Sequence, residues 1–321
     1  MMTDTVQAQA TRDAYGQALV ELGGKNKKIV VLDADLSKST KTVKFAQKFP
    51  ERFFNMGVAE ADMMGTAAGF AASGYIPFAS TFAVFATGRA YDQIRNSIAY
   101  PALRVRIAAT HAGLTVGEDG ASHQALEDIA LMRVLPNMEV VVPADGRETV
   151  KVMAAALKTV RGPLYIRLGR PKVPMVTAED TPFELGRGEI LRDGSDVTII
   201  ACGIMVAQAL EAADLLVKRG VRARVVNMAS IKPLDEDLVV TCARDTGALV
   251  TAEEHSIIGG LGGAVAECLA GRYPVPVLRV GVKDTFGESG PPGQLLQKYG
   301  LSPRDLADAV GQALALKEKF K

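Results

Sequence analysis

The sequence predicts an α/β protein with two domains, each built on a doubly wound and mostly parallel β-sheet. The first observation is that short apolar runs such as Lys28–Asp33 (KIVVLD) alternate with helix-like segments, which is the pattern of buried parallel strands joined by helices. The second is Gly169–Pro182, where three prolines stand among polar residues and after which the alternation starts again. We therefore expect a first domain at residues 1–170, a linker at 171–185 and a second, smaller domain at 186–321.

Apolar runs and helical spacing give the elements of the first half in order. Strands are expected at Lys28–Asp33, Tyr75–Ser80, Arg104–Thr110, Glu139–Val142 and Pro163–Arg167. Helices are expected between them at Ala59–Ala72, Val84–Ala99 and Asp145–Val160. The regular exchange of the two kinds of segment favours a doubly wound sheet.

The second half repeats this alternation on a smaller scale. Strands are expected at Asp196–Ala201, Arg222–Val226 and Ala248–Thr251, and helices at Val206–Val217 and Pro303–Leu316. The glycines of Gly259–Gly263 (GGLGG) open a further helix and favour close helix packing over a dinucleotide loop, because they do not follow the GxGxxG pattern of a first βαβ unit. We interpret His255, just before them, as a structural residue.

Composition excludes several classes of protein. The net charge of +1 and the 23% of charged residues give no global field for nucleic acid or an acidic membrane. The N-terminus lacks the apolar core of a signal peptide, and no apolar run approaches the roughly 18 residues of a membrane helix. The three cysteines stand in apolar runs without metal spacing, which favours reduced thiols and a cytoplasmic protein.

Glu60 is the first of three features that suggest chemistry. It stands at the start of a helix made of small and apolar residues, in NMGVAEADMMGTAAGFAA. A glutamate there can simply satisfy the helix dipole and the free N–H groups. Alternatively, a buried carboxylate could exchange a proton with a nitrogen of a ligand.

Two aromatic residues form the second feature. Phe82 and Phe85 are three residues apart, so on a helix they would share a face. Such a pair is more often part of a core than a platform for a cofactor.

The third feature is the polar, glycine-rich segment ATHAGLTVGEDGASHQALED, which follows an apolar strand. It holds His111, Glu118, Asp119 and His123. Loops at the carboxyl ends of strands are where open α/β sheets bind ligands. The spacing fits no zinc site, and we expect no metal ligands in this chain.

Together the segments GVAEADMMGTAAGFA, TFAVFATGRAYDQIR and GEDGASHQALED resemble three consecutive signatures of transketolases, in order and in spacing. The similarity runs from about Ala10 to the C-terminus, and GEDGxxHQ is its most specific part. The 2-oxoacid dehydrogenase beta subunit resembles the chain in the glutamate helix but lacks this loop. Deoxyxylulose phosphate synthase has a close relative of the loop and stays an alternative.

The resemblance implies a pyrimidine-binding domain for thiamine diphosphate, followed by a transketolase C-terminal domain. Glu60 matches the glutamate that hydrogen-bonds the aminopyrimidine ring and exchanges a proton with it. Phe82 and Phe85 match the aromatic pair around that ring, with Phe85 stacking on it. Asp35 matches an acidic residue near the cofactor across a subunit interface. No third pocket residue is assigned near Gly88–Arg89, where this sequence and the family pattern differ by one position.

The resemblance also implies a site for sugar phosphates. His111 matches a histidine that contacts sugar hydroxyls, Asp119 the carboxylate that reads the C2 hydroxyl of the donor, and His123 a histidine near the reacting carbonyl. Cations and small donors suit the phosphate. They are Arg12, Ser39 and one of Arg167 and Arg170.

One transketolase motif is absent. The family binds magnesium and the cofactor's diphosphate through GDG and a following asparagine in an N-terminal domain, and this sequence contains no GDG. We therefore expect a partner subunit that carries this motif and the magnesium ligands, in an α2β2 heterotetramer that transfers a two-carbon ketol unit. The alternative is a non-catalytic relative with a regulatory or interaction role.

Overall fold

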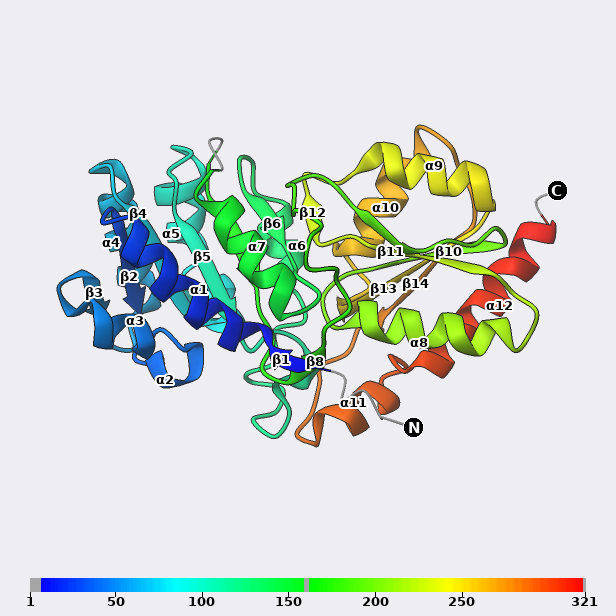
Figure 1. Ribbon diagram of the computed structural model, residues 1–321, viewed down its shortest axis with the longest axis horizontal. Coiled ribbons are helices and arrows are strands. Elements are labelled where there is room, and N and C mark those ends of the chain that lie inside the picture. Colours follow the sequence, from blue (N-terminus) through cyan, green and yellow to red (C-terminus); the bar gives the residue numbers. More distant parts are fainter. Residues whose placement is uncertain (1–6, 159–161, 320–321) are drawn as a thin grey trace.

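The computed structural model describes residues 7–158 and 162–319 and contains two large sheets, each with helices on both faces (Figure 1). The larger sheet has seven strands in the order β12-β6-β7-β5-β4-β2-β3, and the smaller has five in the order β14-β13-β10-β11-β9. Every neighbouring pair in these two sheets is parallel except β12 with β6 and β9 with β11. The predicted class, two doubly wound and mostly parallel α/β layers, is confirmed.

The apolar runs of the sequence supply the central strands. The larger sheet consists of β2 (Ile29–Asp33), β3 (Phe53–Asn55), β4 (Ile76–Phe82), β5 (Arg106–Thr110), β6 (Glu139–Val141), β7 (Leu164–Arg167) and β12 (Ser230–Lys232). The smaller sheet consists of β9 (Glu189–Arg192), β10 (Val197–Ala201), β11 (Ala223–Asn227), β13 (Leu249–Ser256) and β14 (Val277–Val282). Of these, β3, β9, β12 and β14 were not predicted, and β12 brings a strand from the second half of the chain onto the edge of the larger sheet.

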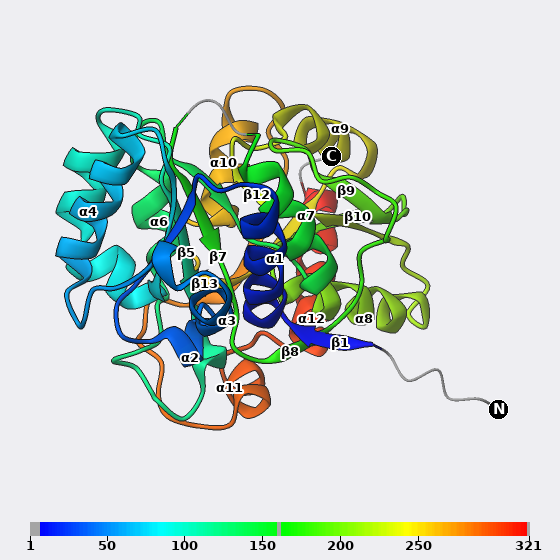
Figure 2. The same cartoon turned by 60° about the vertical axis from the view of Figure 1, so that its left-hand side comes forward.

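Alternate residues of each central strand pack on opposite faces of the larger sheet. In β2, Ile29 and Val31 contact a cluster that includes Tyr15, whereas Val30 and Leu32 belong to the cluster on the other side. One face is covered by α1 (Thr11–Lys25), α3 (Val43–Lys48) and α7 (Gly146–Ala156), and the other by α4 (Glu60–Ala72) and α6 (Asp128–Arg133) (Figure 2). This double burial explains why β2 reads as an uninterrupted apolar run.

The second half builds a similar but smaller layer structure. The helices α8 (Met205–Val217) and α12 (Pro303–Lys319) share one face of its sheet, and α9 (Glu236–Thr246) and α10 (Leu261–Ala270) lie on the other (Figure 1). The short helix α11 (Pro292–Lys298) lies beside the loop that follows β5. One apolar cluster contains residues of both halves, such as Tyr165 and Ile200, so the two sheets share a core.

Three local features differ from the expectations. The predicted helix at 84–99 is instead two π-helical turns, η2 (Phe85–Arg89) and η3 (Ile94–Ala99), around the short α5 (Tyr91–Gln93). The predicted linker contains β8 (Lys172–Pro174), which pairs with β1 (Ala8–Ala10). The helix α7 ends at Ala156, and the last two residues of the helix predicted at 145–160 lie outside the described residues, as do residues 1–6 of the N-terminal segment.

The helix α1 was not predicted because its sequence contains Gly16, Gly23 and Gly24, which lower helix propensity. Gly16 has a packing reason. A Cβ there would lie 2.7 Å from the Cβ and the carbonyl oxygen of Lys41, so only glycine allows this close approach. Across the described ranges, no helix is both long and apolar enough to cross a bilayer.

Candidate active site

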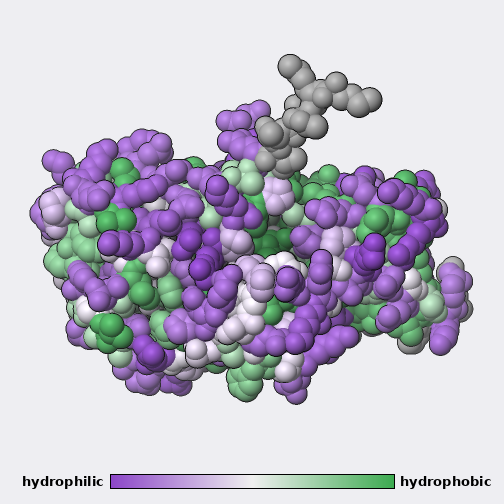
Figure 3. Space-filling view, turned by 90° about the horizontal axis from the view of Figure 1, so that it is seen from below, coloured by the Kyte–Doolittle hydropathy of each residue, from purple (hydrophilic) through white to green (hydrophobic). Residues whose placement is uncertain are grey.

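The residues singled out from the sequence gather along one edge of the larger sheet. Phe82 is the last residue of β4, His111 follows β5, Asp35 follows β2 and Arg170 follows β7. These strands are neighbours in the parallel part of the sheet, so their carboxyl ends meet at the same edge. Open α/β sheets bind ligands at this edge because polar loops converge there. Seen from below, the molecule shows hydrophobic areas scattered among hydrophilic side chains (Figure 3).

Glu60 begins α4 and is only 4% exposed. Its Oε1 accepts a hydrogen bond from Nη1 of Arg89 at 3.2 Å, and the side chain of Arg89 is 55% exposed. The first turn of a helix also favours a negative charge. The Glu60 carboxylate therefore lies at the boundary between the core and the surface, next to a cation that reaches into solvent.

Phe82 and Phe85 form a stacked pair, although they do not lie on one helix as the spacing suggested. Phe82 ends β4 and Phe85 begins the π-helical turn η2. Their ring centroids are 5.9 Å apart with an angle of 13° between the planes. The guanidinium carbon of Arg89 lies 4.2 Å from the Phe85 centroid. Arg89 thus contacts both Glu60 and Phe85, and it is the neighbour of the pair that the sequence left unassigned.

His111 is buried on the other side of Phe82. Its ring stacks on Phe82 with centroids 3.8 Å apart, and its backbone is left-handed with φ 56°. Nη1 of Arg12 is 3.0 Å from Nε2 of His111, and Nδ1 is 2.8 Å from Oγ1 of Thr110. Because arginine only donates, Nε2 must accept, which leaves the proton on Nδ1.

The electrostatic surroundings keep His111 uncharged. Burial, as the largest cause, and the nearby Arg12 and Arg170 cations together lower the pKa of His111 to about 3. A neutral histidine that accepts at Nε2 and donates at Nδ1 is suited to bind hydroxyl groups. It is unsuited to act as a permanent cation.

Arg12 and Ser39 lie side by side next to His111. Arg12 stands in the first turn of α1, and its Nη1 also donates to the carbonyl oxygen of Ser39 at 3.1 Å. Within the described part of the chain, the buried Nε of Arg12 has no hydrogen-bond partner. Arg12 therefore retains a donor that an anionic ligand could satisfy.

The loop after β5 brings His123 and Asp119 to the same region. The half-buried ring of His123 contacts the edge of Phe85, with centroids 5.3 Å apart and an angle of 73°. Asp119 is exposed, and its Oδ2 lies 3.4 Å from Nη1 of Arg170. The structure thus brings together Phe82, Phe85, His111, His123, Arg12 and Ser39 through direct contacts, and Glu60 through Arg89. Asp119 contacts Arg170.

Arg167, one of the two arginines expected near the phosphate, is bonded inside the protein. Its guanidinium is 6% exposed and forms bonds of 2.8 and 3.1 Å with both carboxylate oxygens of Asp128. It also donates to the carbonyl oxygens of Ala125 and Glu254. Because these bonds occupy it inside the protein, we favour Arg170 over Arg167 as the phosphate contact.

Asp35 lies on the surface beside the group, in a left-handed conformation with φ 62°. It bonds Asn55 twice, since its N–H donates to Asn55 Oδ1 at 3.1 Å and its Oδ1 accepts from Asn55 Nδ2 at 2.9 Å. The chain therefore presents this carboxylate outward.

Glu254, from the second half, was not foreseen as part of this region. It is 4% exposed, and its Oε1 accepts a 2.5 Å hydrogen bond from the N–H of Thr115 in the loop after β5. The only signal in the sequence is the unusual Glu253–Glu254 pair in an apolar strand. Its neighbour His255 bonds the backbone at Ala130 and Ser256, as expected for a structural histidine.

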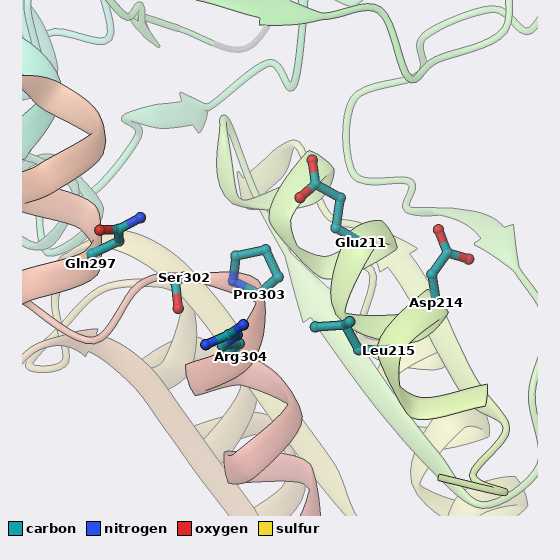
Figure 4. Close-up of a pocket in the computed structure, with 7 residues that line it drawn as sticks. All are labelled: Glu211, Asp214, Leu215, Gln297, Ser302, Pro303 and Arg304. Carbon is teal, nitrogen blue, oxygen red and sulfur yellow. The ribbon is translucent and has the colours of Figure 1, made fainter. Parts of the chain in front are cut away.

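A separate hollow of about 650 Å³ lies in the second half (Figure 4). Its wall comes from α8, α11 and the start of α12, through Glu211, Asp214, Leu215, Gln297, Ser302, Pro303 and Arg304. Asp214 is already paired with Arg192, and Ser302 with Asp305. We assign no function to this hollow.

Two family models together match most of the chain. Residues 7–175 match the family "Transketolase, pyrimidine binding domain", and residues 186–306 match "Transketolase, C-terminal domain". The structure resembles a solved structure described as "Split gene transketolase, inactive beta4 tetramer", with a TM-score of 0.90 and 64% sequence identity over 96% of this chain and 99% of that one.

Two curated relatives illustrate the range of similarity. The "Putative transketolase C-terminal section" of Methanocaldococcus jannaschii is 51% identical over 93% of this chain and 94% of its own length. The 1-deoxy-D-xylulose-5-phosphate synthase of Thermomicrobium roseum is 41% identical over 95% of this chain, which spans only 48% of that enzyme. The chain belongs to the transketolase family, in which it corresponds to the section that contains the pyrimidine-binding and C-terminal domains.

Proposed function

We propose that this chain is one subunit of a thiamine diphosphate-dependent transketolase that transfers a two-carbon ketol unit between sugar phosphates. A partner chain supplies the other half of each site. The observation that carries the proposal is the series of contacts from Glu60 through Arg89, Phe85, Phe82 and His111 to Arg12. It places a buried carboxylate, an aromatic platform, a neutral imidazole and a cation along one edge of the sheet.

The residues present fit the pyrimidine half of the cofactor. Glu60 offers a buried carboxylate to a ring nitrogen, and the half-buried Phe85 offers an aromatic surface. When bound, thiamine diphosphate supplies the thiazolium carbon that carries the transferred unit and serves as the electron sink.

The diphosphate half does not fit this chain. The sequence contains no GDG, and within residues 7–158 and 162–319 no cluster of three or more His, Cys, Asp or Glu side chains could hold a metal. Magnesium requires oxygen ligands together with the phosphates. We therefore place its ligands on an N-terminal transketolase subunit, in an α2β2 assembly where Asp35 lies near the cofactor across the interface.

The side chains of this protein then supply proton exchange and the binding of the sugar phosphate. Glu60 exchanges a proton with the cofactor ring. His111 binds sugar hydroxyls in its neutral form, Asp119 reads the C2 hydroxyl of the donor, and His123 acts near the reacting carbonyl. Arg12, Ser39 and Arg170 bind the phosphate, for which the unpaired Nε of Arg12 is available.

Two similarities support the need for a partner. The relative from Methanocaldococcus jannaschii is described as a C-terminal section, and the solved split-gene structure as an inactive β4 tetramer. A non-catalytic role is disfavoured because Glu60, Phe85, His111 and His123 lie in direct or neighbouring contact, an arrangement with no need to persist in a scaffold. The similarity to 1-deoxy-D-xylulose-5-phosphate synthase keeps this synthase as a competing function.

Reconstitution tests this function. The chain is expressed alone and with a candidate subunit that carries GDG, and each preparation is assayed for ketol transfer from xylulose 5-phosphate to ribose 5-phosphate. We expect activity only in the mixture. Ketol transfer by the rigorously purified single chain would refute the split enzyme. Condensation of pyruvate with glyceraldehyde 3-phosphate by the mixture, without ketol transfer, would instead support the synthase alternative.

A further inference from the structure

The loop that carries Asp119 and His123 is closed at its base. It leaves the sheet at Ala112 and returns at Ala125, where the two residues form a parallel bridge. The N–H of Gly113 donates to the carbonyl oxygen of Ala125 at 3.0 Å. Such a loop has fixed ends, but its body needs further contacts to adopt one conformation.

Three glycines give the backbone of this loop more conformational freedom than other residues would. Gly113, Gly117 and Gly120 have φ values of 80°, 85° and 77°, a region that other residues rarely adopt. An isolated loop with this composition would populate many conformations, and holding one of them costs conformational entropy. Contacts from outside the loop must therefore stabilise the one conformation that it adopts.

The second domain makes contacts at each of these glycines. A Cβ would lie 2.4 Å from the Glu254 carboxyl carbon at Gly113, 3.2 Å from Pro292 at Gly117, and 2.5 Å from the Ser289 hydroxyl at Gly120. The loop thus lies too close to the second domain for side chains at these positions.

Gln124 adds a hydrogen bond across the same boundary. Its Nε2 donates to the carbonyl oxygen of Glu288 in the second domain at 2.9 Å and to that of Leu114 in the loop at 3.1 Å. One buried amide therefore ties the end of the loop to its beginning and to the second domain.

Glu254 makes a further hydrogen bond across this boundary. Its Oε1 accepts from the N–H of Thr115 at 2.5 Å, and Thr115 is only 2% exposed. Without this acceptor, that N–H would be buried without a partner, which is unfavourable. The contact lies four residues after His111 and four before Asp119, so it fixes the loop between the two.

We propose that Glu254 is a positioning residue of the active site, through which the second domain holds the loop in the conformation that presents Asp119 and His123. This inference rests on the proposed transketolase function for those two residues. It gives the C-terminal domain a direct part in the site, although none of its side chains was among the predicted site residues.

Glu253 provides a matched control. It is also buried, stands next to Glu254 on β13, and accepts two backbone hydrogen bonds, from Leu261 at 2.7 Å and Gly262 at 2.8 Å. These partners begin α10 inside the second domain. Removal of either carboxylate should therefore cost similar global stability, but only Glu254 contacts the loop.

The experiment compares Glu254→Ala, Glu254→Gln and Glu253→Ala in the purified full chain by amide hydrogen exchange. We expect Glu254→Ala to speed exchange at residues 113–117 by about tenfold or more, because it removes the acceptor and the packing at Gly113. Glu254→Gln keeps an acceptor oxygen and should restore most of the protection. Glu253→Ala should speed exchange at 261–264 and leave the loop unchanged. Unchanged loop exchange in Glu254→Ala, or equal loop exposure in both alanine variants, would overturn the proposal.

The same variants are then assayed in the reconstituted complex. We expect Glu254→Ala to lower kcat/KM for ketol transfer about tenfold, with rescue by Glu254→Gln and little effect of Glu253→Ala at a comparable melting temperature. Equal losses in both alanine variants would reduce Glu254 to a stabilising residue. If the wild-type complex shows no ketol transfer, the proposed function fails, while the exchange measurement still decides whether Glu254 shapes the loop.

Discussion

The two ends of the candidate site differ in how completely this chain builds them. At the inner end, the stacked and hydrogen-bonded His111 is 3% exposed and lies beside Arg12. At the outer end, Glu60 is equally buried, but its partner Arg89 is 55% exposed. Under the proposed function, the comparison indicates that this chain organises the inner end in advance, whereas the outer end depends on what covers Arg89.

The glycines near the two ends of the site also differ in what surrounds them. In the loop after β5, a Cβ at Gly113 or Gly120 would collide with the second domain, so these glycines serve close packing within the chain. In α4, which begins at Glu60, a Cβ at Gly65 or Gly69 would meet nothing within 4 Å. Gly65 and Gly69 therefore have no packing reason inside this chain, and under the proposed assembly we expect another subunit to approach them.

The largest expected effect concerns the outer end. Glu60→Gln keeps the shape of the side chain but removes its ability to exchange a proton with the cofactor ring. We expect kcat of the reconstituted complex to fall by about 10²–10⁴-fold, the usual contribution of general acid–base catalysis. Asp62→Asn, an exposed acid in the same first turn of α4, is the control and should have little effect. Turnover near that of the wild type in Glu60→Gln would remove this residue from the mechanism.

Much of the fold could be predicted because its central strands are buried on both faces. Such strands, β2 and β5 among them, appear as continuous apolar runs. Short edge strands such as β3 and β12 have only three residues each and carry no periodic signal. The π-helical turns at Phe85–Ala99 could not be predicted either, since the apolar spacing of an ordinary helix is nearly the same.

The site could be predicted where a residue type and a motif coincide, and not where two residues that are distant in the sequence come into contact. Arg89 lies 29 positions from Glu60, and Glu254 lies 139 positions from Thr115. No local pattern signals either contact. The same holds for Arg167, whose buried partner Asp128 is 39 positions away in the sequence.

The next effect tests the inner end through pH. The folded chain keeps the pKa of His111 at about 3, well below the ordinary 6.5, so the unfolded chain binds a proton that the folded chain does not. The stability from this group is therefore fully present above pH 6.5 and is lost as the pH falls towards 3. The slope contributed by one such group is at most about 1.4 kcal/mol per pH unit.

Replacement of His111 by asparagine removes the pH-dependent contribution of this side chain to the free energy of unfolding. The wild-type free energy of unfolding should fall between pH 7 and pH 5 by about 2 kcal/mol more than that of His111→Asn, as measured by urea denaturation of the purified chain. If the free energy of unfolding depended on pH in the same way in the two proteins, His111 would not be held neutral in the folded state. The electrostatic description of the inner end would then be wrong.

The smallest effect returns to the outer end and asks what Arg89 does there. Its guanidinium covers one side of Phe85 at 4.2 Å from the centroid, while Phe82 stacks on the ring at 5.9 Å. It also holds the Glu60 carboxylate at 3.2 Å. A flat ring that stacks on Phe85 and bonds Glu60 needs the same two partners. Under the proposed function, Arg89 therefore competes with the cofactor and has to move aside when it binds.

Arg89→Ala decides whether this competition exists. An exposed cation–π contact is worth about 0.5–1 kcal/mol, so its removal should tighten the binding of thiamine diphosphate to the reconstituted complex by about two- to fivefold, measured by calorimetric titration. Arg95→Ala is the matched control, because Arg95 is an exposed arginine of the neighbouring turn that bonds Asn96. It should leave the affinity unchanged, which separates a local effect from a general loss of positive charge. Weaker binding in Arg89→Ala alone would mean that the guanidinium stays and contacts the cofactor. In that case the outer end, like the inner one, would already be organised by this chain before the partner arrives.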